Sequence, residues 1–355
     1  MESNKSVVSK TRYSNIELFR IVSTLLVLIV HFNGWFVGGL PTLYDFSTIS
    51  VQEGVQLYIQ GLSCCCVNCF LIISGWYGLK LKFRSIWKIW LVLISIYIPC
   101  FFLECLLNHN FVIWRFVDSI VAFSRDSYYI QNYLILIFLS PVLNSFVEKY
   151  GRRITPFVLA LWGIEFIVEY IFRSKYIYIE HGYSLFHFVV MYFLARTAYL
   201  NKEKLFRVKG RTYLIAYFIA ASLIALGRGI FASKGVYLTG YSCPLNIIES
   251  FCLFLFFTQL SINARTINSI ASTTLSVYIL QVTFPVIDFL KRIDGYLLNN
   301  FDYFIYLILA FIVIIVFFLL SSIYAVLMEK IMTPVFSPLG KCLEKKTLNF
   351  FTYEG

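Results

Sequence analysis

Charged residues are scarce in this chain. They make up 14% of its 355 residues, and only 19 residues are acidic, whereas ordinary globular proteins carry about 25% charged residues. Hydrophobic residues make up 59% of the sequence. A water-soluble fold of this size leaves too much of its surface outside the core to bury that apolar content. The composition therefore excludes a soluble domain and predicts an integral membrane protein.

Signals for metal binding and for disulfides are also weak. The chain has four histidines and nine cysteines, without two C-x-x-C pairs. Four of the cysteines lie in one apolar run with no histidine nearby: Cys64, Cys65, Cys66 and Cys69. We expect them to be small, polarizable packing residues. The first apolar run is long enough to span a bilayer and no cleavage site follows it, so we expect no cleavable signal peptide.

Long apolar runs dominate what is present. A spanning helix needs about 20 mostly apolar residues, and the pattern predicts an all-α, polytopic transmembrane bundle of about ten helices. Residues 111–124 mix aromatic residues with Arg115 and Asp118, which is typical of an interfacial amphipathic helix. The predicted spans are 15–36, 54–78, 85–107, 128–148, 154–173, 183–200, 211–231, 244–263, 273–293 and 303–329.

The net charge of +11 is spread between the apolar runs. Because the basic residues form no patch with interleaved aromatic residues, we do not expect nucleic-acid binding. Most lysines and arginines fall on one side of the ten spans, the side that holds both chain ends. The bias of basic residues toward cytoplasmic loops therefore predicts two cytoplasmic termini.

The first span carries three ionisable residues, Glu17, Arg20 and His31. At 100° per residue, Arg20 and His31 differ by only about 20° around the helix, and Glu17 lies about 40° from His31 on the other side. All three therefore point along one stripe. The rise between Arg20 and His31 is about 16 Å, which puts Arg20 near the cytoplasmic surface and His31 deep in the membrane.

The chemistry of His31 and Arg20 suits the membrane depths at which we expect them. Ionisable residues inside lipid are costly and often functional. A neutral imidazole such as that of His31 accepts a proton near neutral pH, and an arginine such as Arg20 binds phosphate well. The alternative is that Arg20 and Glu17 form an interfacial ion pair while His31 is a packing residue. The spacing alone leaves both interpretations open.

Other polar residues are weaker candidates. Ser74, Arg228 and Glu249 are possible substrate-binding residues, with Asn246 close to Glu249 in the sequence, although a tight helix end is the better explanation of Ser74. His181 and His187 are possible acceptor-binding residues on the outer side. We expect Glu165 and Glu169, one turn apart, to be structural, Glu104 to lie at the interface and His109 to be solvated.

Four stretches resemble the bacterial acyltransferase-3 family of membrane acyltransferases. Arginine, ten residues and histidine in the first span, after Asn-x-Glu, are similar to that family's first motif. Residues 67–76, which end in Ser-Gly-Trp, residues 133–144 with their Ser-Pro exit, and residues 270–281 resemble further motifs in the same order. The resemblance extends over residues 12 to about 333. The resemblance departs at Gln281, where the family usually has histidine, so we assign no catalytic role to Gln281. It also departs at Lys80 and Lys82, where arginine is common in the family.

The resemblance implies an acyl donor, acetyl-CoA, as a substrate rather than a permanently bound cofactor. Arg20, Lys80, Lys82 and Arg84 would bind its phosphates. His31 would act on the acceptor hydroxyl or take the acetyl group itself, with Arg20 and Glu17 completing the catalytic set. The chain divides into a cytoplasmic segment (1–14), a membrane acyltransferase domain (15–333) and a cytoplasmic tail (334–355).

The function that this implies is O-acetylation of a cell-surface polysaccharide or its lipid-linked precursor, at the inner membrane of a bacterial cell. Partners would be acetyl-CoA, the glycan and membrane lipids. An alternative is a secondary transporter of a glycan, lipid or small metabolite, with Arg20 and His31 as a proton relay. An acyltransferase with another acceptor or another acyl donor is a third possibility.

Overall fold

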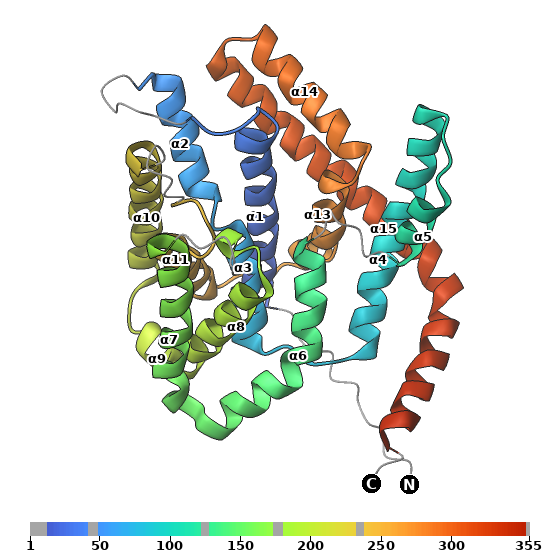
Figure 1. The fold of residues 1–355 in the computed structure, drawn as a ribbon, viewed down its shortest axis with the longest axis horizontal. Coiled ribbons are helices and arrows are strands. Elements are labelled where there is room, and N and C mark those ends of the chain that lie inside the picture. Colours follow the sequence, from blue (N-terminus) through green and yellow to red (C-terminus); the bar gives the residue numbers. More distant parts are fainter. Residues whose placement is uncertain (1–12, 42–48, 122–127, 173–179, 232–237, 353–355) are drawn as a thin grey trace.

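A computed structural model of the chain shows an all-α protein (Figure 1). It describes residues 13–41, 49–121, 128–172, 180–231 and 238–352. The first half contains α1 (Ser14–Val30), η1 (His31–Trp35), α2 (Val51–Ser63), α3 (Cys66–Tyr77), α4 (Phe83–Asn108), α5 (Ile113–Val121), α6 (Tyr128–Tyr150), η3 (Gly151–Ile154), α7 (Thr155–Phe166) and η4 (Ile167–Ile171). The second half contains η5 (Glu180–Gly182), α8 (Leu185–Leu200), α9 (Lys202–Leu205), α10 (Gly210–Phe231), α11 (Pro244–Thr258), α12 (Arg265–Ala271), α13 (Thr274–Val282), α14 (Val286–Asn300) and α15 (Tyr303–Thr352).

The number of candidate membrane spans is lower than predicted. Within the described ranges, six helical stretches are long and apolar enough to cross a membrane, or seven if one bent helix pair forms a span. The prediction of about ten spans is therefore wrong in number, while a multi-pass membrane protein is confirmed. The six stretches are Ser14–Trp35, Val51–Tyr77, Phe83–Asn108, Tyr128–Ile171, Gly210–Phe231 and Tyr303–Gly340.

The missing spans have three physical causes. Two predicted spans became α8 and α11, which have 16 and 15 residues and reach only about 24 and 22 Å, less than the roughly 30 Å of a bilayer core. Two more fuse into the stretch Tyr128–Ile171, in which Gly151 with φ +53° turns the chain between α6 and α7. The predicted span 273–293 is broken, because α13 and α14 meet at 75°.

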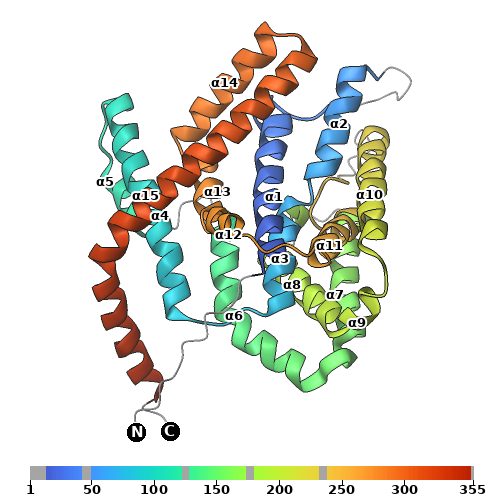
Figure 2. The same cartoon turned by 180° about the vertical axis from the view of Figure 1, so that it is seen from behind.

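Helix α1 lies in the centre of the molecule in both views (Figures 1 and 2). On one side Ile16, Phe19 and Val27 belong to the main apolar core, which α3, α8 and α11 complete. On the other side Leu28 and Phe32 pack in a second cluster with residues of α13, α14 and α15. Helix α1 is therefore buried on two faces, while Arg20 on its polar stripe stays partly exposed.

Close contact between α3 and α8 fixes the core beside α1. A Cβ atom at Gly75 would lie 2.6 Å from the Cβ of Ala195 and from the carbonyl oxygen of Tyr192. Only glycine allows this approach, as is common where membrane helices pack. Helix α3 then ends at Gly78, whose φ of +73° is a conformation that side chains disfavour.

Two further helices cover segments discussed above, the predicted amphipathic segment and the predicted tail. The amphipathic segment forms α5 (Ile113–Val121), whose residues are not buried; residues 122–124 of that prediction lie outside the described residues. Trp90 donates from Nε1 to the Ile120 carbonyl, 3.0 Å away, and ties α5 to α4. At the other end α15 continues through residue 334 to Thr352, so the predicted tail continues the last helix.

Candidate active site

The polar stripe of α1 forms as the spacing predicts, within one helix and its continuation. Residues Ser14–Val30 are α-helical, and His31 begins the π-helical turn η1. Along the stripe Thr24 donates from Oγ1 to the Arg20 carbonyl, 2.9 Å away. Because the hydroxyl is satisfied within the helix, it needs no partner in the surrounding helices.

At one end of the stripe Arg20 and Glu17 form an ion pair. The Arg20 Nη1 atom lies 3.6 Å from the Glu17 Oε2 atom, and the two side chains are 41% and 9% exposed. One carboxylate does not occupy the five donors of a guanidinium. The exposed part of Arg20 therefore remains available to an anion.

The basic residues after α3 lie at the same end of α1. Tyr77 is within electrostatic range of both Arg20 and Glu17. Lys80 is three residues further along the chain, a span of at most about 11 Å. Lys80, Lys82 and Arg84 are all exposed. The structure thus brings the four predicted phosphate-binding residues to one end of the bundle.

An arginine that the prediction did not single out lies beside this turn. Arg196 donates from Nη1 to the Trp76 carbonyl, 3.1 Å away, and its guanidinium lies over the Tyr199 ring at 5.2 Å from the centroid. It caps the end of α3 and adds positive charge there. Its position in α8 gave no sequence signal, because only the fold brings α8 next to the turn.

His31 occupies the opposite end of the stripe, in the π-helical turn. The Phe36 amide donates to the His31 carbonyl over 2.8 Å, five residues back, and such turns are frequent at functional sites. The imidazole packs against Trp35 and Phe36, with ring centroids 5.0 and 5.9 Å away. Its Nδ1 atom is buried and makes no hydrogen bond to the described residues.

Gln281 and Lys291 complete the surroundings of His31. Gln281, at the end of α13, is fully buried and lies beside the imidazole. Lys291 of α14 is within electrostatic range of His31, and its Nζ atom lies 4.7 Å from the centroid of Trp35. The break between α13 and α14 places both residues here. Sequence reasoning assigned Gln281 no catalytic role and did not single out Lys291.

A second buried polar cluster lies in the main core. His187 is fully buried, with Nδ1 2.9 Å from Glu165 Oε1 and Nε2 2.9 Å from Asn68 Oδ1. Asn68 in turn donates from Nδ2 to Asn246 Oδ1 and to the Tyr241 carbonyl, at 2.9 and 2.8 Å. Because the Asn68 oxygen accepts, Nε2 carries a proton, and Glu165 and His187 share one more proton between them.

The remaining candidates have packing contacts of their own. Ser74 donates from Oγ to the Phe70 carbonyl at 3.0 Å and contacts the Tyr133 hydroxyl at 3.2 Å. Glu249 is fully buried, with the Cys64 thiol 3.8 Å from its Oε2 atom. Arg228 is 8% exposed within α10.

The described cysteines are free thiols, from Cys64 to Cys252. In the part of the chain that the structure describes, no group of three or more histidine, cysteine or acidic residues is arranged to hold a metal ion. The prediction that the cysteine-rich run packs the core agrees with the burial of all four of its thiol residues: Cys64, Cys65, Cys66 and Cys69.

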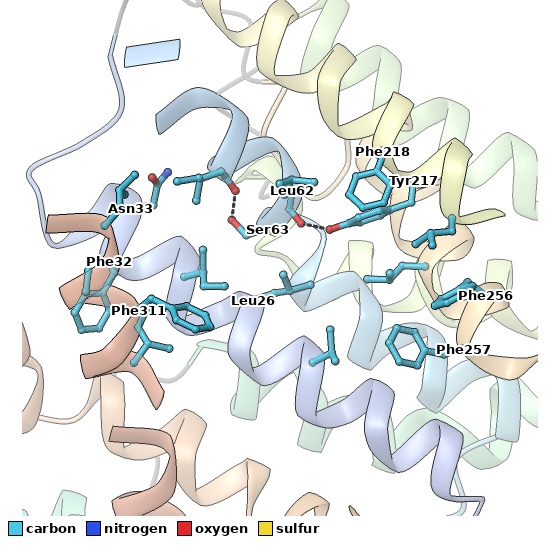
Figure 3. Close-up of a pocket in the computed structure, with 18 of the residues that line it drawn as sticks. Leu26, Phe32, Asn33, Leu62, Ser63, Tyr217, Phe218, Phe256, Phe257 and Phe311 are labelled. Atoms are coloured by element: carbon cyan, nitrogen blue, oxygen red, sulfur yellow. Dashed lines mark hydrogen bonds between the residues drawn. The ribbon is translucent and has the colours of Figure 1, made fainter. Parts of the chain in front are cut away.

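A cavity of about 500 Å³ lies on another face of α1 (Figure 3). Helices α1, α2, α10, α11 and α15 line it with mostly aliphatic and aromatic side chains. Val22 is a lining residue, and His31 lies nine residues later, about half a turn round the helix. The polar lining groups are already bonded: Ser63 Oγ to the Ile59 carbonyl and the Tyr217 hydroxyl to the Leu62 carbonyl. The cavity therefore offers space for hydrocarbon and no groups for acyl transfer.

The fold and site define a multi-pass, all-α membrane protein with a buried polar site on its first span. The chain matches no protein-family model, no curated protein and no solved structure.

Proposed function

We propose that this chain is a membrane O-acetyltransferase that moves an acetyl group from cytoplasmic acetyl-CoA to a hydroxyl of a cell-surface polysaccharide or its lipid-linked precursor. One observation carries the proposal: the half-buried His31 imidazole lies at one end of a polar stripe, with its buried Nδ1 atom unpaired among the described residues. At the other end Arg20 is partly exposed near a basic turn. The resemblance of the motifs to membrane acyltransferases agrees with this arrangement.

The donor would bind with its phosphates at the basic end. Arg20 offers a planar fork of donors to a phosphate, and lysine binds phosphate as a point charge. Lys80, Lys82 and Arg84 are exposed and free to turn toward the same anion. The roughly 16 Å rise from Arg20 to His31 is of the same order as the pantetheine arm, which would carry the thioester toward His31.

The reaction then needs one base. His31 would take the proton of the acceptor hydroxyl, while the hydroxyl oxygen forms a bond to the thioester carbonyl carbon. The carbon–sulfur bond breaks, and the CoA thiolate takes the proton back from the imidazolium. The products are the acetate ester and CoA-SH. General base catalysis of this type contributes about 10²–10⁴-fold to a rate.

The acceptor would approach His31 from the side of the membrane opposite to the basic turn. Lys291 supplies a positive charge over Trp35 on that side, which suits a sugar that bears a carboxylate or phosphate. In this orientation both termini face the cytoplasm, and the enzyme would lie in the inner membrane of a bacterial cell.

Transfer of labelled acetyl groups tests the proposal. Membranes that contain the chain, made in a host with surface polysaccharide, are incubated with acetyl-labelled acetyl-CoA, and label is counted in the polysaccharide. We expect incorporation with the wild-type chain and background label with His31→Ala and Arg20→Ala. The control is His109→Asn, because His109 is exposed and adopts a left-handed conformation with φ +50° that asparagine tolerates. Equal incorporation with His31→Ala would refute the proposal.

One observation favours a transporter as a second candidate. Helices α13 and α14 form a bent pair with an angle of 75°, and Gln281 of α13 lies beside His31. Broken helices form the substrate and ion sites of many secondary transporters. Proton-coupled uptake into vesicles, without acetyl transfer and lost in His31→Ala, would favour this candidate over the enzyme.

A further inference from the structure

Gln281 is buried without the hydrogen bonds that an amide requires. Its side chain is fully buried. Neither its Oε1 nor its Nε2 atom makes a hydrogen bond of normal distance and angle to the described residues, although the amide lies within looser hydrogen-bonding reach of His31. Buried side-chain amides are almost always satisfied, and each exception calls for an explanation. Gln60 provides the contrast within this protein, because its buried Oε1 accepts from Asn33 Nδ2 at 3.2 Å.

The packing of α13 against α1 holds this amide next to His31. Val277 of α13 lies in the same apolar cluster as Leu28 of α1 and Phe32 of η1. Gln281 lies one helical turn after Val277 and His31 lies three residues after Leu28, so each continues the same helix face. The imidazole that it adjoins also has an unpaired atom, Nδ1. Two unsatisfied buried groups therefore face one site.

We propose that Gln281 positions His31 and binds the acyl carbonyl, a role that rests on the acetyl-transfer function proposed above. The Gln281 Oε1 atom accepts the Nδ1 proton of His31 when the substrate is bound. This fixes the tautomer in which Nε2 has the free lone pair, so that Nε2 acts as the base. The Gln281 Nε2 group donates to the thioester carbonyl oxygen, where negative charge develops when the acceptor oxygen attacks.

This arrangement leaves the atoms of the reaction balanced. The acceptor proton moves to His31 Nε2 while negative charge develops on the carbonyl oxygen, where the Gln281 amide stabilises it. When the carbon–sulfur bond breaks, the carbonyl forms again and His31 gives the proton to the CoA thiolate. A neutral amide suits both tasks, since one end accepts and the other donates. A preorganised donor aimed at a developing oxyanion is typically a large contributor to catalysis.

Nitrogen NMR tests the positioning role without any reaction. The protein is labelled with ¹⁵N-histidine and studied in lipid nanodiscs, where its four histidines give few imidazole signals, and His31→Ala identifies those of His31. We expect wild-type His31 to be the Nδ1–H tautomer when an unreactive thioether analogue of acetyl-CoA is bound. Gln281→Leu should change the His31 signals toward a tautomer mixture and leave those of His187 unchanged. Unchanged His31 signals in Gln281→Leu would refute the positioning role.

Kinetics test the carbonyl-binding role. Gln281→Glu keeps an acceptor for His31 but loses the donor, so we expect the tautomer to persist while kcat for acetyl transfer falls about 100-fold with little change in KM for acetyl-CoA. The control is Gln60→Leu, a buried glutamine with a structural partner, for which kcat of the folded protein should stay near the wild-type value. Wild-type kcat in Gln281→Glu would refute the donor role. If wild type itself transfers no acetyl, the proposed function fails, and the NMR result still decides the contact between Gln281 and His31.

Discussion

The two histidine sites within the helical bundle, at His187 and at His31, differ in how well their polar atoms are paired. His187 bonds through both ring nitrogens, to Glu165 and to Asn68. His31 has an unpaired Nδ1, next to a glutamine with two unpaired atoms. His187 is fully buried, whereas His31 is half-buried with its Nδ1 atom shielded from solvent. The difference lies in the partners that the fold supplies.

That difference separates a structural polar cluster from a site that is open to a ligand. A buried polar network whose hydrogen bonds are all made favours one packing arrangement. Buried polar groups without partners lower the free energy of unfolding, and a bound ligand that supplies the missing hydrogen bonds removes that loss. The cluster around His187 joins α3, α7, α8 and α11 through side chains from all four. The cluster around His31 contains unpaired polar atoms among the described residues, which agrees with the substrate-binding role proposed for it.

Removing the His31 side chain should give the largest functional loss. In His31→Ala we expect acetyl transfer to fall by about 10²–10⁴-fold, while the midpoint of thermal unfolding in detergent changes little, because no partner of Nδ1 is left unpaired. The measurement is label incorporation at equal amounts of folded protein, judged by size-exclusion chromatography.

Chemical rescue gives a second test of the difference between His31 and His187. Adding imidazole to His31→Ala should restore part of the activity, because a free base can occupy the space that the side chain leaves. If His31→Ala is instead poorly folded and does not respond to imidazole, His31 belongs with His187 as a structural residue.

Removing the His187 side chain should give the largest loss of stability. His187→Ala leaves Glu165 and Asn68 buried without their partner, and breaking a buried ion pair typically costs about 3–5 kcal/mol. We expect a lower midpoint in urea or thermal unfolding, and acetyl transfer that falls only with the amount of folded protein.

The matched control is the neighbouring pair on the same helical stretch. His181 Nδ1 lies 2.7 Å from Glu169 Oε1, but the His181 side chain is 47% exposed. The variant is His181→Asn, because residue 181 has a left-handed φ of +49° that asparagine tolerates. The Glu169 carboxylate is 6% exposed but keeps its bond from the Ser242 hydroxyl, so the loss should be less than about 1 kcal/mol. Equal losses in the two variants would contradict the view that burial makes the His187 cluster important.

The class of protein and the helical stripe follow from the sequence, whereas the number of spans does not. Composition identifies a membrane protein, and helical spacing places Glu17, Arg20 and His31 on one stripe, because both depend only on local order. The number of spans was wrong because hydropathy does not reveal where a helix bends. The turn at Gly151 and the break after Val282 depend on local backbone geometry and on tertiary packing.

The partners of the two histidines could not be predicted from the sequence. His187 and Asn68 are 119 residues apart in the chain, and nothing local in either segment indicates the other. Gln281 was assigned no catalytic role because it departs from a motif, although it is buried beside His31 with two unpaired atoms. A motif match shows which residue type is common at a position in similar proteins. Unpaired buried atoms show which hydrogen-bond partners are missing at a site.

A smaller effect is expected at the phosphate-binding end. In Arg20→Lys the positive charge remains but the bidentate fork is lost, so KM for acetyl-CoA should rise about 10-fold, equivalent to about 1.4 kcal/mol, with kcat nearly unchanged. Arg20→Ala should raise KM further. The control is Arg153→Ala, an exposed arginine outside this cluster, with an unchanged KM. An effect of Arg20→Lys on kcat alone would place Arg20 in the chemical step rather than in donor binding.

The smallest effect is expected on the exposed face of α14, next to the site. Arg292 pairs with Asp288 one turn away, at 2.8 Å, but the two side chains are 80% and 44% exposed. Exposed pairs with this spacing contribute about 0.3–0.5 kcal/mol, so Arg292→Ala should leave both the unfolding midpoint and acetyl transfer near wild type. Lys291→Ala, one residue earlier, removes the charge over Trp35 and should raise the KM of an anionic acceptor. The two variants would then differ in their effect on this KM, because Lys291 is the residue that lies near His31. Equal effects on KM would show that the total charge of α14 matters rather than the single contact of Lys291.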